Sequence, residues 1–167
     1  MTPEGVNIDS IKDQLTAGDV AFGTANPVNA QLGPAMSDAL DGALAAAGAE
    51  HIEPVALVVL EQTPRQPADL RDLAQDLASE TQFETVIVRT PHASGAVSER
   101  LSRYQIESAQ RAMLEHSDYP EGVRAFVDTA VSTGWSWPLV AALFLLAAAA
   151  VVLGTAVTVL RSRTSAR

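Results

Sequence analysis

The longest apolar stretch of the sequence, which contains no charged residue, constrains the chain most. It runs from Pro138 to Leu160 and reads PLVAALFLLAAAAVVLGTAVTVL. As an α-helix rising about 1.5 Å per residue it would measure roughly 35 Å, enough to cross a hydrocarbon core of about 30 Å. Trp135 and Trp137 precede it, where interfacial aromatic side chains are expected. A buried domain helix would need a second apolar segment to cover it, and the sequence has none. We therefore predict one transmembrane helix in the plasma membrane.

The charges that flank this stretch predict its direction. Arg161, Arg163 and Arg167 follow it, whereas the 23 residues before it contain one arginine, Arg124, among four acids. The positive-inside rule then places the tail 161–167 in the cytoplasm and the domain outside the membrane. The opposite orientation stays open, because the N-terminus MTPEGVNIDS lacks the basic start and apolar run of a signal peptide.

The net charge argues against two kinds of partner for the domain. The whole chain carries −9, and removing the three arginines after residue 160 leaves −12 on the remainder. Nucleic acid requires a basic face, and anionic lipid attracts basic segments, so we expect neither to bind the domain. The chain also contains no cysteine, which excludes disulfides, thiolate chemistry and cysteine-based zinc sites.

The segment before the membrane helix predicts an α/β domain. Apolar residues at helical spacing indicate helices that start at Gly33-Pro34, at Pro67 and at Glu121, with the first ending at Gly48 and the last at Val131. Continuous apolar runs predict two strands buried on both faces, Pro54–Leu60 and Thr85–Arg89. Strand, helix and strand in this order predict a parallel βαβ unit with a right-handed crossover, flanked by helices.

Two segments are harder to assign. Residues 91–113 fit either one helix or an edge strand that reaches Glu107 before a helix begins near Ser108, and we favour strand then helix. Residues 1–31 are polar and rich in glycine, so we expect a flexible arm with at most a short helix at Ile8–Leu15. The predicted organisation is therefore an arm (1–31), an α/β domain (32–132), a transmembrane helix with an interfacial lead-in (133–160) and a basic tail (161–167).

The loop after the second predicted strand, TPHASGAVS, is the candidate functional site, because open α/β sheets bind ligands at the carboxyl ends of their strands. A serine and a histidine two residues apart are weak support for catalysis, which also needs an orienting group and an oxyanion donor. GxSxG is absent, and a polar turn explains the loop equally well. We therefore predict no catalytic residue, but contact with an anion or a partner by these side chains: Arg89, His92, Ser94, Arg100 and Arg103.

No metal or cofactor is predicted. Asp69, Asp72 and Asp76 lie on one polar helix face, which is typical of solvated surface and lacks the converging oxygens that calcium requires. His51 and His116 have no partner at zinc-binding spacing. The apolar helix contains no ionisable residue, as transport would normally require, so we interpret it as an anchor.

Residues 32–161 resemble a family of small actinobacterial single-pass membrane proteins. The likeness rests on VALVVLEQTP, PADLRDLAQDL, ETVIVRTPHASGAVS and the WSWP that begins the apolar stretch. Members of this family are encoded beside NlpC/P60-type cell-wall hydrolases, and the soluble part is similar to the TPM domain, an α/β fold on membrane-tethered proteins. Some TPM proteins are phosphatases and others assist complex assembly. The resemblance implies the fold and the tether, and it transfers no catalytic residue because no acidic cluster follows the strands.

The leading hypothesis is a non-enzymatic interaction domain, tethered in the actinobacterial cell envelope, that assists envelope or membrane-complex proteins. One rival is a membrane-anchored hydrolase of the TPM type, for example a phosphatase that uses the Arg89–Arg103 region. Another is a single-span accessory subunit of a larger assembly such as a respiratory complex. We expect the chain to contact the lipid bilayer through one helix and a protein partner in the envelope or in a membrane complex, and we expect no nucleic acid as a partner.

Overall fold

A four-stranded mixed sheet forms the centre of the domain. The computed structural model describes residues 5–132 together with Leu145 and Leu146. The strands lie in the order β1-β2-β3-β4, with β1, β2 and β3 parallel and β4 antiparallel to β3. Their bounds are Val20–Phe22, Val55–Val59, Thr85–Arg89 and Ser94–Ser98. We call the end of the sheet where β1, β2 and β3 begin the amino edge, and the end where they finish the carboxyl edge.

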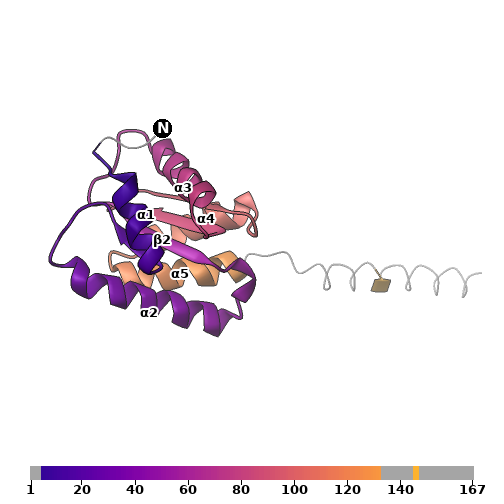
Figure 1. The fold of residues 1–167 in the computed structure, drawn as a ribbon. Coiled ribbons are helices and arrows are strands. Elements are labelled where there is room, and N and C mark those ends of the chain that lie inside the picture. Colours follow the sequence, from indigo (N-terminus) through magenta and orange to yellow (C-terminus); the bar gives the residue numbers. More distant parts are fainter. Residues whose placement is uncertain (1–4, 133–144, 147–167) are drawn as a thin grey trace, which may run out of the picture. The chain divides into compact units, whose positions relative to one another are not determined.

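Helices cover both faces of this sheet (Figure 1). One face carries α1 and α3, and the other carries α2, α4 and α5. A short 3-10 helix, η1, precedes β2. The helices have these bounds: α1 Ile8–Ala17, α2 Asn29–Ala47, η1 Glu50–Ile52, α3 Ala68–Glu80, α4 Arg103–Leu114 and α5 Tyr119–Ser132. All residues of β2 and β3 are buried, which confirms that these strands are covered on both faces.

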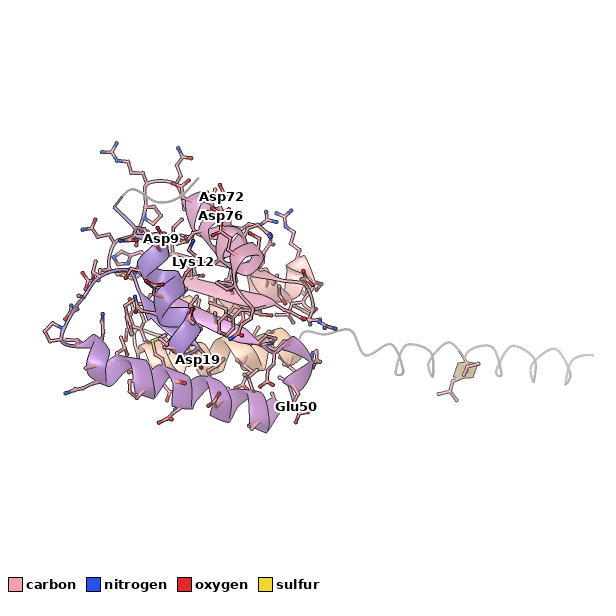
Figure 2. The ribbon with its side chains drawn as sticks, viewed as in Figure 1. Asp9, Lys12, Asp19, Glu50, Asp72 and Asp76 are labelled. Atoms are coloured by element: carbon pink, nitrogen blue, oxygen red, sulfur yellow. The ribbon has the colours of Figure 1, made fainter. Side chains whose placement is uncertain are left out.

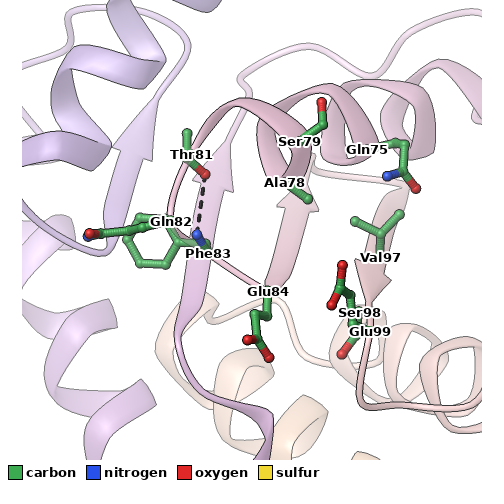
Figure 3. A pocket seen from close by; sticks show the side chains of 10 residues that line it. All are labelled: Gln75, Ala78, Ser79, Thr81, Gln82, Phe83, Glu84, Val97, Ser98 and Glu99. Atoms are coloured by element: carbon green, nitrogen blue, oxygen red, sulfur yellow. Dashed lines mark hydrogen bonds between the residues drawn. The ribbon is translucent and has the colours of Figure 1, made fainter.

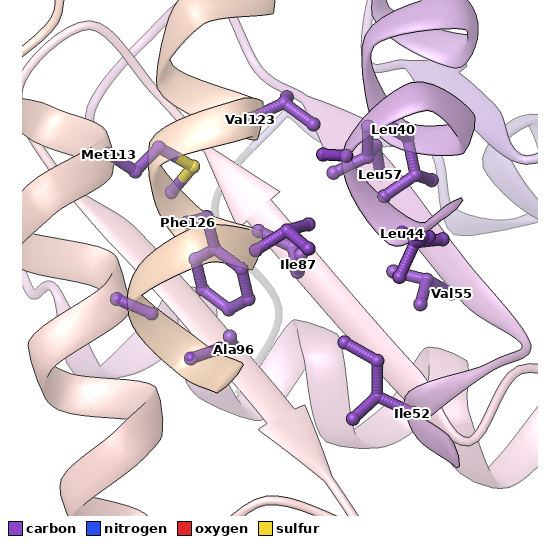
Figure 4. Packing of buried hydrophobic residues seen from close by; sticks show 14 of the residues in the cluster. Leu40, Leu44, Ile52, Val55, Leu57, Ile87, Ala96, Met113, Val123 and Phe126 are labelled. Carbon is purple, nitrogen blue, oxygen red and sulfur yellow. The ribbon is translucent and has the colours of Figure 1, made fainter. Parts of the chain in front are cut away.

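Two apolar cores result from the alternation of side chains along the strands. Leu57 and Ile87 point towards the larger core, where they pack with Phe126 of α5 and Leu40 of α2 (Figure 4). Val58 and its alternate neighbours point to the opposite core, under α1 and α3. The full burial of Phe126, at 0 % exposed, shows that α5 is part of the domain itself.

The two parallel crossovers differ in hand. β1–α2–β2 and β2–α3–β3 both step in the same direction across the sheet, yet α2 and α3 lie on opposite faces. Two such crossovers must have opposite hands. If β2–α3–β3 is right-handed, as expected for a βαβ unit, β1–α2–β2 is of the rare left-handed kind. The cause is local, because α1 already covers β1 on the face that α2 would otherwise occupy.

The central elements match the sequence-based expectation. The helix after Pro67, the strand Thr85–Arg89 and the parallel pairing of β2 with β3 are confirmed, and α5 contains the predicted Glu121–Val131. The strand-then-helix order in residues 91–113 is also confirmed, but α4 begins at Arg103 and not near Ser108. Ser102 and Gln105 form a capping box there, so residues 103–107 are helical instead of extended.

The N-terminal region differs from the expected arm. It contributes α1, whose Ile11 and Leu15 are buried, and the edge strand β1. Three residues of strand give too short a periodic pattern to detect in the sequence. The side chain of Gln14 also pairs with the outer edge of β1, donating to Phe22 O at 2.9 Å and accepting from Phe22 N at 3.0 Å. This segment is therefore part of the α/β domain.

The helix predicted to start at Gly33-Pro34 starts earlier. α2 begins at Asn29, and Pro34 lies inside it. Proline at this position removes the hydrogen bond that Ala30 O would otherwise accept, but Ala30 is exposed, so water can reach that carbonyl. The proline therefore falls where the helix tolerates the loss.

Within residues 5–132 and 145–146, no helix combines the length and apolar character needed to cross a bilayer. The predicted span Pro138–Leu160 and its flanking Trp135 and Trp137 lie outside the described residues, apart from Leu145 and Leu146. Those two leucines are helical and exposed.

Candidate functional site at the carboxyl edge of the sheet

Three loops leave the sheet at its carboxyl edge: residues 23–28 after β1, residues 60–67 after β2 and residues 90–93 after β3. This is the edge where open α/β sheets bind their ligands. The polar side chains of the loops bond to one another, and these bonds define the site.

Glu61 connects the first loop to the second. Asn26 Nδ2 donates a hydrogen bond of 2.9 Å to Glu61 Oε1. Hydrogen bonds from Asn26 and Thr24 stabilise the charged carboxylate and so lower the pKa of Glu61. Asn29 Nδ2 in turn donates to Thr24 O at 2.8 Å. Glu61 is therefore an exposed, ionised carboxylate whose position is fixed by the neighbouring loop.

Two threonine hydroxyls connect the second loop to the third. Thr63 Oγ1 donates to Thr90 Oγ1 at 2.9 Å, and the buried Thr90 hydroxyl donates to Ala93 O at 2.8 Å. Thr90 Oγ1 also accepts from Ala93 N at 3.0 Å. These bonds close the turn between β3 and β4 and leave His92 exposed at its tip.

Arg89 is the last residue of β3 and is only 4 % exposed. Its guanidinium donates to His116 O and, at 3.3 Å, to Tyr119 O, and its Cζ lies 4.1 Å from the centroid of the Tyr119 ring. Burial lowers the pKa of Arg89, although an arginine remains charged at any physiological pH. Because His116 follows the end of α4 and Tyr119 begins α5, Arg89 fastens the end of α4 and the start of α5 to the sheet.

Ser94 lies directly across from Arg89 in the antiparallel register, so both side chains point to the face that carries α4 and α5. Ser94 Oγ and Arg89 Nε are buried and have no hydrogen-bond partner within the described residues. In the same part of the chain no hydrogen bond joins Ser94 to His92. The serine and histidine of the loop therefore do not form a nucleophile–base pair.

Arg100 and Arg103 lie at the opposite, amino edge. Arg100 Nε is 2.7 Å from Glu84 Oε2, and Arg103 Nε is 2.6 Å from Glu107 Oε1. Each arginine lowers the pKa of its glutamate through a hydrogen bond to the carboxylate. The length of β3, roughly 13 Å over five residues, separates this edge from Arg89.

The five residues singled out in the sequence thus form two groups. Arg89, His92 and Ser94 share the carboxyl edge, and Arg100 and Arg103 do not join them. Reasoning from the sequence missed the hydrogen-bonded side chains of the two preceding loops. One feature of the sequence could have indicated them. A Thr-Pro pair follows both β2 and β3, and the threonines of these pairs, Thr63 and Thr90, bond to each other.

Acidic side chains are spread over the surface. Asp9 belongs to α1, Glu50 to η1, and Asp72 and Asp76 to α3 (Figure 2). Among residues 5–132, no three His, Asp or Glu side chains converge closely enough to hold a metal ion. The ion pair of Lys12 Nζ with Glu80 Oε2, at 2.9 Å, connects α1 to α3.

A surface pocket of about 250 Å³ opens at the amino edge, between the end of α3 and the end of β4 (Figure 3). Gln75 and Ser79 line it from α3, and Glu99 lines it from the segment after β4. Its volume is below the ~300 Å³ at which ligand pockets usually begin. The pocket is also at the other end of the strands from the hydrogen-bonded loops, so the two do not form one site.

Comparison with known proteins gives three results. No curated protein matches the sequence significantly. The fold is similar to the solution NMR structure of the N-terminal domain of the cg2496 protein from Corynebacterium glutamicum, with a TM-score of 0.47 and 14 % identity, over 71 % of this chain and 81 % of that one. A family described as "Membrane protein Rv1476" matches residues 1–167. Because this match spans the whole chain, the protein belongs to the membrane protein Rv1476 family.

Proposed function

We propose that this protein is a membrane-tethered interaction module of the cell envelope. One helix, residues 138–160, anchors it, and the acidic α/β domain contacts an envelope protein or a membrane complex. Membership of a membrane protein family supports association with the membrane, and the uncharged stretch is the segment suited to provide it.

The observation that carries the proposal is the bonding between the carboxyl-edge loops. Asn26 bonds to Glu61, and Thr63 bonds to Thr90, so three loops form one fixed polar surface. A preorganised surface loses little entropy when it binds a partner, which favours recognition. Covalent catalysis would instead need a nucleophile held against a base.

The proposed orientation follows from the arginines after the span, which favour a cytoplasmic tail and a domain outside the membrane. A domain charge of −12 favours a partner with a basic contact surface. The resemblance to proteins encoded beside cell-wall hydrolases, and to the TPM domain, agrees with a role in the envelope.

Cross-linking in native membranes, followed by affinity purification of the full chain, tests the proposal. We expect one partner to be recovered repeatedly with the wild type and with Glu53→Lys, which alters an exposed residue before β2. Recovery should fall strongly with Glu61→Lys, because this change reverses a charge of the carboxyl-edge surface.

Two outcomes would contradict the proposal. One is recovery of this chain without any partner under all cross-linking conditions. The other is hydrolysis of a generic phosphoester by the purified protein, lost on substitution of His92 or Arg100, which would favour the hydrolase. Reporter fusions at both termini would report the side of the membrane independently.

A further inference from the structure

Two glutamates lie opposite each other at the amino edge of the sheet. Glu99 N donates a hydrogen bond to Glu84 O at 3.3 Å, which continues the antiparallel ladder of β3 and β4 by one pair. Directly opposite residues point their side chains to the same face, here the face of Val86 and Val97 that carries α3. Like charges in such a pair repel each other, so a cation beside them is stabilising.

Arg100 supplies one positive charge, and its guanidinium binds Glu84. Arg100 Nε lies 2.7 Å from Glu84 Oε2, and Arg100 Nη2 lies 3.4 Å from Glu84 Oε1. The hydrogen bond to Glu84, followed by the charges of Glu84 and Glu99, raises the pKa of Arg100. Within residues 5–132 the Glu99 carboxylate itself takes part in no hydrogen bond or ion pair. Glu99 therefore keeps an acceptor that a further cation can use.

The pocket between α3 and β4 opens beside Glu99. Ten residues line it, and the charged ones among them, Glu84 and Glu99, are both acids. Gln75 of α3 faces this strand segment with its side-chain amide (Figure 3). Ala78 and Val97 belong to the core under α1 and α3 and supply apolar surface between these polar groups. The pocket thus combines apolar walls with a carboxylate and an amide at its rim.

This lining matches a long side chain that ends in a cation. The methylene groups of an arginine can lie on apolar surface while the guanidinium stays at a polar rim. Its planar fork binds a carboxylate at two points, as Arg100 does on Glu84, and still has N–H groups to donate to an amide oxygen. A volume of about 250 Å³ is small for a whole organic ligand, which favours a single side chain.

We propose that the pocket between α3 and β4 binds the side chain of an arginine from a protein partner, with the guanidinium on Glu99. The negative charge of the domain favours a basic partner as the source of this arginine. The inference adds a second contact surface, at the opposite edge of the sheet from the carboxyl-edge loops. It does not depend on those loops or on the tether, so it can fail while the proposed function holds, and the reverse.

Amide NMR of the full chain in phosphatidylcholine nanodiscs, titrated with Nα-acetyl-argininamide, tests the pocket directly. This probe carries the arginine side chain without the terminal charges of the free amino acid. We expect saturable shifts at residues 75–79 and 97–99. The citrulline analogue, whose side chain is similar in shape but uncharged, should cause none. Equal shifts with both probes, no shifts, or shifts centred elsewhere in the domain would overturn the proposal.

Matched variants test the contact with Glu99. Glu99→Gln should weaken binding of Nα-acetyl-argininamide about fivefold, because it removes one exposed ion pair. Glu115→Gln, which changes an exposed acid at the other end of α4, should leave the affinity unchanged. Equal affinities of the wild type and Glu99→Gln would refute the contact.

The same titration identifies the source of the arginine. Free arginine should bind no more tightly than the capped probe, because an arginine within a protein has no charged ends. Tighter binding of free arginine would indicate a site for the amino acid and overturn the assignment to a partner. Self-association of the full chain that the capped probe reverses would also overturn it, because a second copy would then supply the arginine.

Discussion

Arg89 shows how one buried side chain connects several elements. It extends from the end of β3 to the carbonyls of His116, in the α4–α5 connection, and of Tyr119, which begins α5, and it lies over the Tyr119 ring. Gly122 on α5 leaves room for it, because a Cβ there would collide with the Arg89 guanidinium and lie 2.8 Å from Met113 O. The sequence predicts that Arg89 contacts an anion or a partner, because local sequence does not indicate which backbone carbonyls lie near this side chain.

Replacing Arg89 should destabilise the domain strongly. Arg89→Met leaves the two carbonyls without donors and loses the ring contact, so we expect a loss of about 3 kcal/mol in the free energy of unfolding. Arg65→Met, at an exposed loop position, should change stability by less than about 0.5 kcal/mol. Urea denaturation of both variants measures the difference, and equal losses would exclude this structural role of Arg89.

Two glycine-to-alanine changes should have opposite signs. Gly122→Ala inserts a methyl group against Arg89 and Met113 O and should destabilise by about 1–3 kcal/mol. Gly42→Ala, in α2, meets no atom within 4 Å and should stabilise by about 0.5–1 kcal/mol, because alanine loses less backbone entropy in a helix. Thermal unfolding followed by circular dichroism should show Tm values shifted in opposite directions. Stabilisation by both changes would show that α5 does not pack closely on Arg89.

Glu84 should titrate below the usual range of a glutamate. Its hydrogen bond with Arg100 lowers its pKa, so the stability that it contributes is present above the unfolded pKa of about 4.3 and is lost as the pH falls through the lower folded pKa. Carboxyl NMR titration of the wild type and Arg100→Gln measures this directly. A Glu84 pKa that does not rise in Arg100→Gln would show that the pair does not persist in solution.

At the scale of elements, the predictable parts are those with a complete periodic pattern. β2, α3 and β3 bury whole faces, so their apolar spacing defines them without tertiary information. β1 could not be predicted, because three residues carry no periodicity and the strand is stabilised by pairing with β2 and by Gln14. The start of α4 could have been predicted from the sequence, because Ser102 followed by Gln105 three residues later is the pattern of a capping box.

The capping box of α4 should contribute measurably to stability. Ser102→Ala removes the acceptor for Gln105 N and should cost about 1 kcal/mol in the free energy of unfolding. Ser117→Ala, in the exposed connection before α5, is the control and should be nearly neutral. Hydrogen exchange at residues 103–106 provides a local measurement. Equal exchange rates in the two variants would contradict the assigned start of the helix.

For the whole molecule, the sequence predicts the α/β class and the position of a tether, but not the arrangement of the candidate site. Arg100 and Arg103 follow Arg89 closely in the chain, yet the antiparallel return of β4 carries them to the other edge. The contacts between the three loops join residues up to 35 positions apart. Such contacts follow from topology, which local patterns do not contain.

The domain should fold without the uncharged stretch. Residues 1–133 form one compact unit, so a chain ending at Ser132 should remain in solution, unfold cooperatively and keep the core around Phe126. The full chain should instead need detergent or lipid for purification. Sedimentation and heteronuclear NMR of the two forms provide the measurement. Aggregation of the shorter chain would show that the domain depends on the segment that follows it.

The side chain of Gln14 affects whether copies of the domain can associate through the edge strand β1. A short exposed strand is a place where a second chain can add and start an unwanted sheet. By bonding to both the N–H and the C=O of Phe22, the amide of Gln14 occupies the positions that an incoming strand would use. Molecules confined to a membrane surface meet at high local concentration. Between molecules of a membrane protein, the Gln14 side chain therefore opposes edge-to-edge pairing of β1 strands into a polymer.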